Sequence, residues 1–102
     1  MNLKFKKWDL VKRFNCHMIT RHERDNFTEI IWDFDIDNDE IMHEAIEGSI
    51  EFTEMIVRSG YEVINSWLQV SENVLGRTEH SIFMVVNIPY AEIEGGGNLY
   101  LN

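Results

Sequence analysis

The stretch FTEIIWDFDIDNDEIMHEAIEGSIEFTEMIVRSG, residues 27–60, decides the fold because its apolar periodicity changes within it. In residues 27–36 apolar and β-branched side chains alternate with acids, which is typical of a strand with one buried side. From residue 38 onward the apolar residues recur at helical spacing. The segment therefore predicts a strand followed by an amphipathic helix. The buried side of the strand is expected to carry Thr28, Ile30, Trp32, Phe34 and Ile36.

The helix is expected to begin near Asn38 and to end before Gly60. Asp37 followed by Glu40 resembles a capping box, and glycine is a natural residue just after a helix. The buried stripe of the helix is predicted to be Ile41, Met42, Ala45, Ile46, Ile50, Thr53 and Ile56. On the opposite side, steps of four and three align five acids. This row, called the glutamate ridge below, consists of Glu40, Glu44, Glu47, Glu51 and Glu54.

A second strand is expected before residue 27, because the apolar residues upstream share even numbering. They are Trp8, Leu10, Phe14, Cys16 and Met18. Residues 6–13 fit a short helix equally well. A three-residue hairpin loop at residues 24–26 would pair residues whose numbers sum to 50. The expected pairs are then Phe14 with Ile36, Cys16 with Phe34, Met18 with Trp32, Arg21 with Glu29, His17 with Asp33, and Arg13 with Asp37.

Residues 61–70 and 81–93 are two more β-rich stretches, separated by a polar loop around Gly76. The element order is then β-β-α-β-β, an α+β fold in which one helix packs on one face of an antiparallel sheet. Residues 98–101 could add a short edge strand. The second hairpin is apolar on both faces, so either the N-terminal segment or another molecule must cover the face without the helix.

Length and composition predict a single domain spanning residues 1–102, with 44% hydrophobic residues to form one core. Eighteen acids against nine bases give a net charge of −9, which disfavours direct binding to nucleic acid or to an anionic membrane. The bases gather in residues 1–25, where they can pair with the acidic middle or remain free for a partner. Cys16 is the only cysteine, so no intramolecular disulfide is possible. Without a signal-peptide core or a membrane span, a cytoplasmic setting is expected.

Residues 33–39 raise the alternative of a divalent-metal-binding domain. Their alternating acids, with Glu44 eleven residues after Asp33, resemble the ligand spacing of a twelve-residue calcium loop. Position six of that loop requires glycine and is Asn38, while position eight requires an aliphatic residue and is Glu40. We therefore expect no metal and no cofactor.

Catalytic signatures are also weak in this sequence. No nucleophile lies in a recognisable elbow, and the glycines at 95–97 lack the following helix that phosphate binding requires. His17 opposite Asp33 is the best acid–base pair, and a surface ion pair is the simpler interpretation. The sequence predicts that the protein is not an enzyme.

The glutamate ridge is the strongest functional feature of the sequence. Its Cβ atoms are about 5–6 Å apart, similar to phosphates along a nucleic-acid strand. Together with Asp33, Asp35 and Asp39 near its N-terminal end, we expect it to engage a basic surface on a partner protein. In its general character the chain resembles protein inhibitors of nucleic-acid-handling enzymes, including anti-restriction and anti-CRISPR proteins. That resemblance implies nucleic-acid mimicry and covers no motif.

A competing interpretation is a self-associating domain in which the acids serve only solubility. Its dimer face would be formed by Tyr61, Trp67 and Phe83, which are aromatic residues expected on the uncovered side of the sheet.

Overall fold

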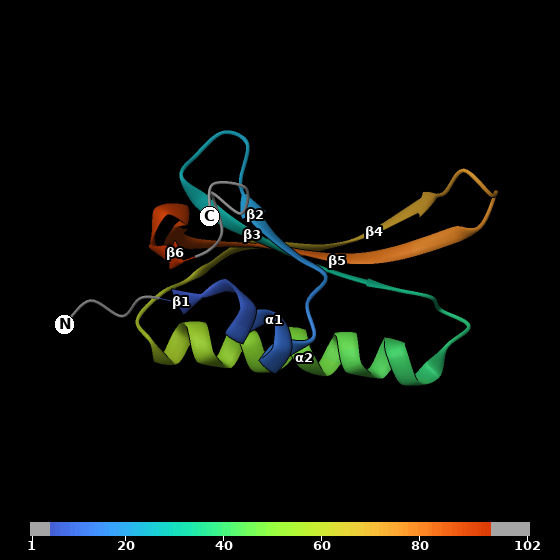
Figure 1. Ribbon diagram of the computed structural model, residues 1–102, viewed down its shortest axis with the longest axis horizontal. Helices are drawn as coiled ribbons and strands as arrows, with labels where there is room; N and C mark the ends of the chain where they lie inside the picture. The colour runs from blue at the N-terminus through green and yellow to red at the C-terminus, as the bar shows by residue number, and fades with distance from the viewer. Residues whose placement is uncertain (1–4, 95–102) are drawn as a thin grey trace.

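The computed structural model describes residues 5–94, and it confirms the α+β class and the antiparallel sheet. The elements are β1 (Phe5–Lys6), α1 (Lys7–Phe14), β2 (Met18–Arg21), β3 (Phe27–Phe34), α2 (Asp39–Arg58), β4 (Val63–Glu72), β5 (Thr78–Pro89), the 3₁₀ turn η1 (Tyr90–Glu92) and β6 (Ile93–Glu94). The four-stranded sheet has the order β2-β3-β5-β4, and β1 pairs in parallel with β6. Two helices are present where one was predicted, and both lie on the same side of the sheet (Figure 1).

Helix α1 decides between the two interpretations of the N-terminal segment. Leu10 and Phe14 lie one helical turn apart and are buried, whereas Trp8 is exposed. The helix ends at Asn15, whose left-handed backbone (φ 54°) breaks the hydrogen-bonding pattern. A helical step of four preserves even numbering just as a strand does, so the parity of the apolar residues did not distinguish the two. Strand β2 is therefore shorter than predicted and begins at Met18.

The β2–β3 hairpin has a different register from the predicted one, because its loop is longer. The backbone N–H of His22 donates to the carbonyl of Phe27 (2.8 Å), and the paired residues sum to 49 instead of 50. A slip of one residue turns a strand over. Ile19 therefore lies opposite Ile30 and is buried, whereas Met18, expected in the core, is exposed.

Strand β3 shows the predicted alternation. Thr28, Ile30, Trp32 and Phe34 are all buried on the side that faces the helices. The Thr28 hydroxyl donates to the carbonyl of Ile88 (2.8 Å), which satisfies this polar group inside the core. Ile36 does not join them, because the strand ends at Phe34 and a turn exposes the following residues.

The N-cap of α2 is Asn38, one residue after the position that the capping-box pattern gave. The Asn38 side-chain oxygen accepts a hydrogen bond from the backbone N–H of Ile41 (3.2 Å). Asp37 instead belongs to the preceding turn, where its own N–H donates to Asp35 Oδ1 (2.9 Å). The capping function therefore lies with Asn38, and the Asp37 carboxylate makes no hydrogen bond within residues 5–94.

Replacing Asn38 with alanine is expected to lower the free energy of unfolding by about 1 kcal/mol, because the first turn of α2 loses its side-chain acceptor. The matched variant Asp37→Ala should lose no more than about 0.5 kcal/mol, since it loses a charge near the helix N-terminus but no side-chain hydrogen bond. Urea unfolding of both variants measures the difference. If both variants lose the same free energy of unfolding, Asn38 is not the residue that caps α2.

The buried face of α2 is rotated relative to the predicted stripe. Ala45 and Ile56 are buried as expected, but Ile41, Ile46 and Ile50 are exposed. The residues that α2 buries are Ala45, Gly48, Ser49, Phe52 and Ile56. The rotation follows from α1, which packs against α2 at Gly48, where the missing side chain allows the two backbones to approach.

Three aromatic side chains form the centre of the core between α1, α2 and β3. The ring of Phe52 makes edge contacts with Phe14 (centroids 5.2 Å apart) and with Trp32 (5.8 Å). The Trp32 indole Nε1 donates to the carbonyl of Phe14 at 2.8 Å. This hydrogen bond satisfies a buried donor and also fixes the C-terminal end of α1 against β3.

The opposite face of the sheet is not covered by the N-terminal helix, because α1 lies on the same side as α2 (Figure 1). The sequence predicted that either the N-terminal segment or another molecule covers this face. The described part of the N-terminal segment does not cover it. Residues 98–101, where an edge strand was predicted, lie outside the described residues. Within residues 5–94 no helix is long and apolar enough to cross a membrane.

Candidate functional site

The glutamate ridge lies on a continuous helix and faces solvent. Helix α2 spans twenty residues, and all five ridge glutamates are exposed. At 1.5 Å of rise per residue the ridge extends for about 21 Å. Within residues 5–94 its single ion pair joins Glu54 to Arg58 one turn later, at 3.9 Å. The other four carboxylates are therefore available to an external cation.

The basic N-terminal segment does not neutralise the ridge within the described residues. Arg13 of α1 places its guanidinium over the ring of Phe14, 5.0 Å from the centroid. The contacts between the basic and acidic segments involve histidines and reach β3 instead of α2. His17 Nε2 lies 3.3 Å from Asp33 Oδ2, and His22 Nδ1 lies 3.5 Å from Glu29 Oε2.

The predicted aspartates do not extend the ridge into one surface. Asp33 lies opposite Ser81 of β5, on the face of the sheet that points away from the helices. The ridge lies beyond the helix layer, so the sheet and α2 separate the two. Asp35 is in the turn before α2, and Asp39 opens the helix on a different flank from the ridge. Of the proposed partner-binding set, only the five glutamates form one surface.

The 33–39 segment is organised as a turn and a helix cap. The carbonyl of Asp35 accepts from the backbone N–H of Asn38 (3.0 Å), and its side chain accepts from Asp37. Asp33 is directed elsewhere, toward His17 and Ser81. Among residues 5–94, no group of three or more His, Cys, Asp or Glu side chains is placed to hold a metal ion.

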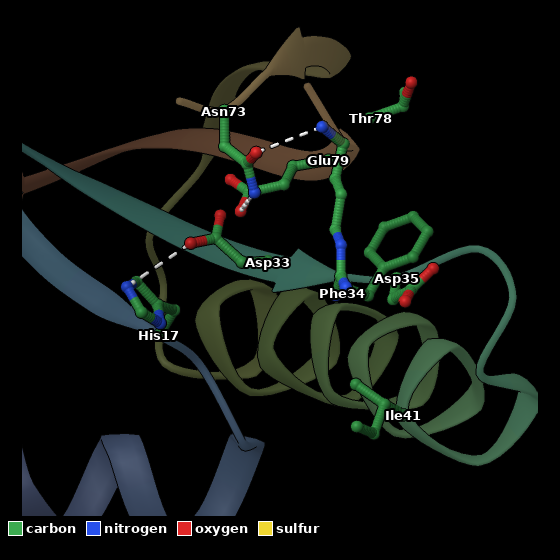
Figure 2. Close-up of a pocket in the computed structure, with 9 residues that line it drawn as sticks. His17, Asp33, Phe34, Asp35, Ile41, Asn73, Thr78 and Glu79 are labelled. Carbon is green, nitrogen blue, oxygen red and sulfur yellow. Dashed lines mark hydrogen bonds and ion pairs between the residues drawn. The ribbon is translucent and has the colours of Figure 1, made fainter. Parts of the chain in front are cut away.

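A polar pocket of about 390 Å³ lies beyond the end of β3, between the β4–β5 turn and the start of α2 (Figure 2). Its lining residues are His17, Asp33, Phe34, Asp35, Ile41, Asn73, Arg77, Thr78 and Glu79. Asn73 organises the turn that forms one wall. Its Oδ1 accepts from the N–H groups of Leu75 (2.9 Å) and Arg77 (3.1 Å), and its Nδ2 donates to Glu79 (3.1 Å). Both charge signs line this pocket.

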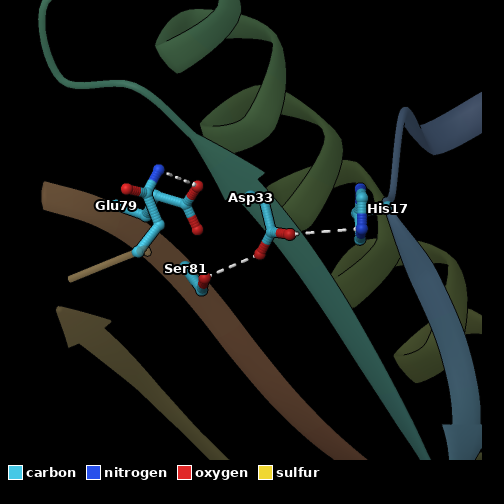
Figure 3. A network of polar contacts seen from close by, with 5 residues as sticks. His17, Asp33, Glu79 and Ser81 are labelled. Atoms are coloured by element: carbon cyan, nitrogen blue, oxygen red, sulfur yellow. Dashed lines mark hydrogen bonds and ion pairs between the residues drawn. The ribbon is translucent and has the colours of Figure 1, made fainter. Parts of the chain in front are cut away.

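In the wall of the pocket, Asp33 contacts both His17 and Ser81 (Figure 3). The Ser81 hydroxyl donates to Asp33 Oδ1 at 2.6 Å, and His17 lies on the other carboxylate oxygen. The side chains of His17 and Asp33 are in contact as predicted, although the observed register does not make the two residues direct cross-strand partners. A nucleophilic triad requires the imidazole between the hydroxyl and the carboxylate, and here the carboxylate is in the middle. The arrangement fixes the three side chains without activating the serine.

The three aromatic residues of the predicted dimer face do not come together. Trp67 and Phe83 are cross-strand neighbours on β4 and β5, and their rings stack with centroids 5.2 Å apart. Tyr61 lies in the α2–β4 connection and contacts the ring of Phe5 instead. Its hydroxyl donates to Glu92 at 3.0 Å, and this hydrogen bond, with a smaller contribution from burial, raises the pKa of Tyr61.

Cys16 is a core residue and not a reactive thiol. Its side chain is buried beside the carbonyl of Leu10, with Sγ 3.8 Å from the oxygen. Burial raises the pKa of the Cys16 thiol from 9.0 to about 11, so the thiolate that reacts as a nucleophile is suppressed near neutral pH.

Sequence reasoning missed the contribution of the β4–β5 turn to the pocket and the hydrogen bond from Ser81 to Asp33. Gly76, with φ 75°, and Asn73 were visible turn signals. The place of Ser81 beside Asp33 depends on the pairing of β3 with β5, 48 residues apart in sequence, and no local pattern encodes that pairing.

Comparison of the chain with family models, curated proteins and solved structures finds no match.

Proposed function

We propose that this protein is a non-enzymatic binding protein whose glutamate ridge engages a basic surface on a partner protein. The observation that carries the proposal is the exposure of all five ridge glutamates along one helix, with a single ion pair, at Glu54, among the residues that the structure describes. Like charges one turn apart repel by about 0.2–0.5 kcal/mol per pair. A partner that supplies lysines and arginines would remove this repulsion on binding.

The class of partner that fits best is an enzyme or other protein that handles nucleic acid, because its binding surface is already arranged for a row of negative charges. The ridge offers carboxylates at intervals of about 5–6 Å over about 21 Å, held rigid by the core behind α2. A net charge of −9 would also accelerate the encounter with a basic protein. In this proposal the protein acts as an inhibitor that occupies the nucleic-acid site.

Self-association through the predicted aromatic dimer face is the weaker candidate function. Two copies that each carry a charge of −9 repel one another. The predicted aromatic dimer face is also smaller than expected, because Tyr61 is engaged with Phe5 and Glu92 and does not extend the Trp67–Phe83 pair.

Reversing three ridge charges in the variant Glu44→Lys/Glu47→Lys/Glu51→Lys is expected to weaken binding to the partner by about 10- to 100-fold. The partner is first captured from an extract of the source organism on the immobilised chain, and its affinity is then measured by titration. The midpoint of thermal unfolding should stay unchanged or rise slightly, since like-charge repulsion along α2 is reduced.

The matched control is Glu23→Lys/Glu62→Lys/Glu72→Lys, which changes the net charge equally at exposed positions outside α2. It should retain most of the affinity, and raising the salt concentration should weaken the wild-type complex. If the control variant loses as much affinity as the ridge variant, net charge and not the ridge governs binding, and the proposal is wrong.

A further inference from the structure

Helix α2 is covered by α1 on one flank only. At Gly48 the carbonyl of Phe14 approaches so closely that Leu10 and Phe14 of α1 are buried. The opposite flank carries Ile46, Ile50 and Val57, at steps of four and seven, which remain 40%, 54% and 62% exposed. Large aliphatic side chains in one row, left uncovered on a helix that already has a buried face, are typical of a binding surface.

Strand β4 carries further exposed apolar residues on the face of the sheet that points toward the helices. Leu68 and Val70 are each 58% exposed, and they pair with Ile82 and His80 of β5. Residues directly opposite in an antiparallel pair share a face of the sheet. Ile82 packs on the core, and the ring of His80 stacks on Phe34 with centroids 5.6 Å apart, so this is the face toward the helices.

The bare flank of α2 is the one that lies toward β5 and β4. Thr53, which is in the same helical row as Ile46, Ile50 and Val57, places its hydroxyl 3.7 Å from the sulfur of Met84 in β5. We call the five exposed residues the β4-side apolar surface: Ile46, Ile50, Val57, Leu68 and Val70. No element among residues 5–94 closes it in the way that α1 closes the opposite flank.

Charge next to this surface indicates what it accepts. Glu47 and Glu54 of the ridge each lie one turn from Ile50, and Glu54 also lies one turn before Val57. A shallow hollow of about 420 Å³ combines both kinds of side chain, and its lining residues are Thr53, Glu54, Val57 and Arg58. The surface is therefore apolar along one side and anionic along the other.

We propose that the β4-side apolar surface binds an amphipathic cationic helix of the partner, with its apolar side chains on Ile50 and Val57 and its lysines or arginines on Glu47 and Glu54. This inference rests on the proposed function, since it specifies how the same partner is held. Binding of an amphipathic helix along an apolar surface, with charged residues at one edge that pair with charges on the helix, is a common mode of recognition. A second copy of this chain fits less well, because it would bring two acidic ridges together.

The test uses two synthetic peptides of identical length and leucine–lysine composition, one with leucines at helical spacing and one scrambled. Fluorescence anisotropy with the full chain should show the amphipathic peptide binding at least about tenfold more tightly than the scrambled one. The variant Ile50→Ser/Val57→Ser should abolish that difference in affinity. The variant Glu47→Lys/Glu54→Lys should bind both peptides more weakly than the wild type does. Both serine positions are exposed, so circular dichroism should show a folded protein.

Equal affinity for the two peptides, unchanged in the serine variant, would overturn this inference and leave the proposed function standing. If neither peptide binds, the inference is overturned as well, whereas the proposed function fails only if Glu44→Lys/Glu47→Lys/Glu51→Lys binds the captured partner as tightly as the wild type does. Sedimentation is measured in parallel. Self-association that is lost in the serine variant would assign the surface to a second copy and overturn the inference.

Discussion

Replacing Phe52 with alanine is expected to lower the free energy of unfolding by about 3–5 kcal/mol, which is the usual range for a fully buried phenylalanine. The side chain is 1% exposed, and its ring contacts both Phe14 and Trp32 edge-on. Alanine would leave a cavity between the helices and β3. Those two aromatic rings would then lose their common neighbour.

The matched variant is Ile50→Ala, two residues earlier on the same helix. Its side chain is exposed and alanine is the better helix former, so the free energy of unfolding should change by no more than about 0.5 kcal/mol. Urea unfolding followed by tryptophan fluorescence reports on both variants. A large loss for Ile50→Ala with a small one for Phe52→Ala would mean that α2 is rotated toward the stripe that the sequence predicts.

The face of α2 was predictable only in part, because the sequence shows apolar residues on more than one side of the helix. The stripe predicted from periodicity includes Ala45 and Ile56, which are buried, but also Ile41, Ile46 and Ile50, which are exposed. The structure instead buries Gly48, a small residue that carries no hydrophobic signal. The close approach of α1 at Gly48 determines which face of α2 is buried. The position of α1 depends on tertiary packing, which the periodicity of α2 does not show.

The hairpin illustrates a second limit of local patterns. Strand β3 followed from its alternation, since four successive even-numbered residues are buried. The register of β2 depended on the length of the loop. One additional loop residue placed Ile19 in the core and left Met18, which was expected there, exposed. Both residues are apolar, so the sequence alone did not favour one over the other.

The candidate binding features differ in the same way. The glutamate ridge depends only on helical spacing within residues 40–54, so it could be predicted from the sequence and is found exposed. The polar pocket and the β4-side apolar surface depend on strand pairing and on where α1 packs. Asp33 was grouped with the ridge because it is near in sequence, and the sheet places it on the opposite side.

Replacing Gly48 with alanine is expected to destabilise the protein by about 2–4 kcal/mol, because the new methyl group overlaps the backbone of α1. An added Cβ would lie 1.9 Å from the carbonyl oxygen of Phe14 and 3.2 Å from Trp32 Nε1. The obstructing atom is backbone, so no side-chain rotation relieves the overlap. Helix α1 must move, and the hydrogen bond from Trp32 to Phe14 breaks.

The neighbouring variant Glu47→Ala separates this effect from helix propensity. Its exposed site gains a good helix former, and the free energy of unfolding should stay within about 0.5 kcal/mol of the wild-type value. An alanine at position 48 that stabilises the protein, as Gly→Ala does in an ordinary exposed helix, would show that α1 does not pack here.

If Gly48→Ala behaves as expected, α1 loosens while the glutamates stay in register on α2. A folded Gly48→Ala protein that still binds the basic partner would then show that recognition depends on α2 itself and not on the helix packed beside it.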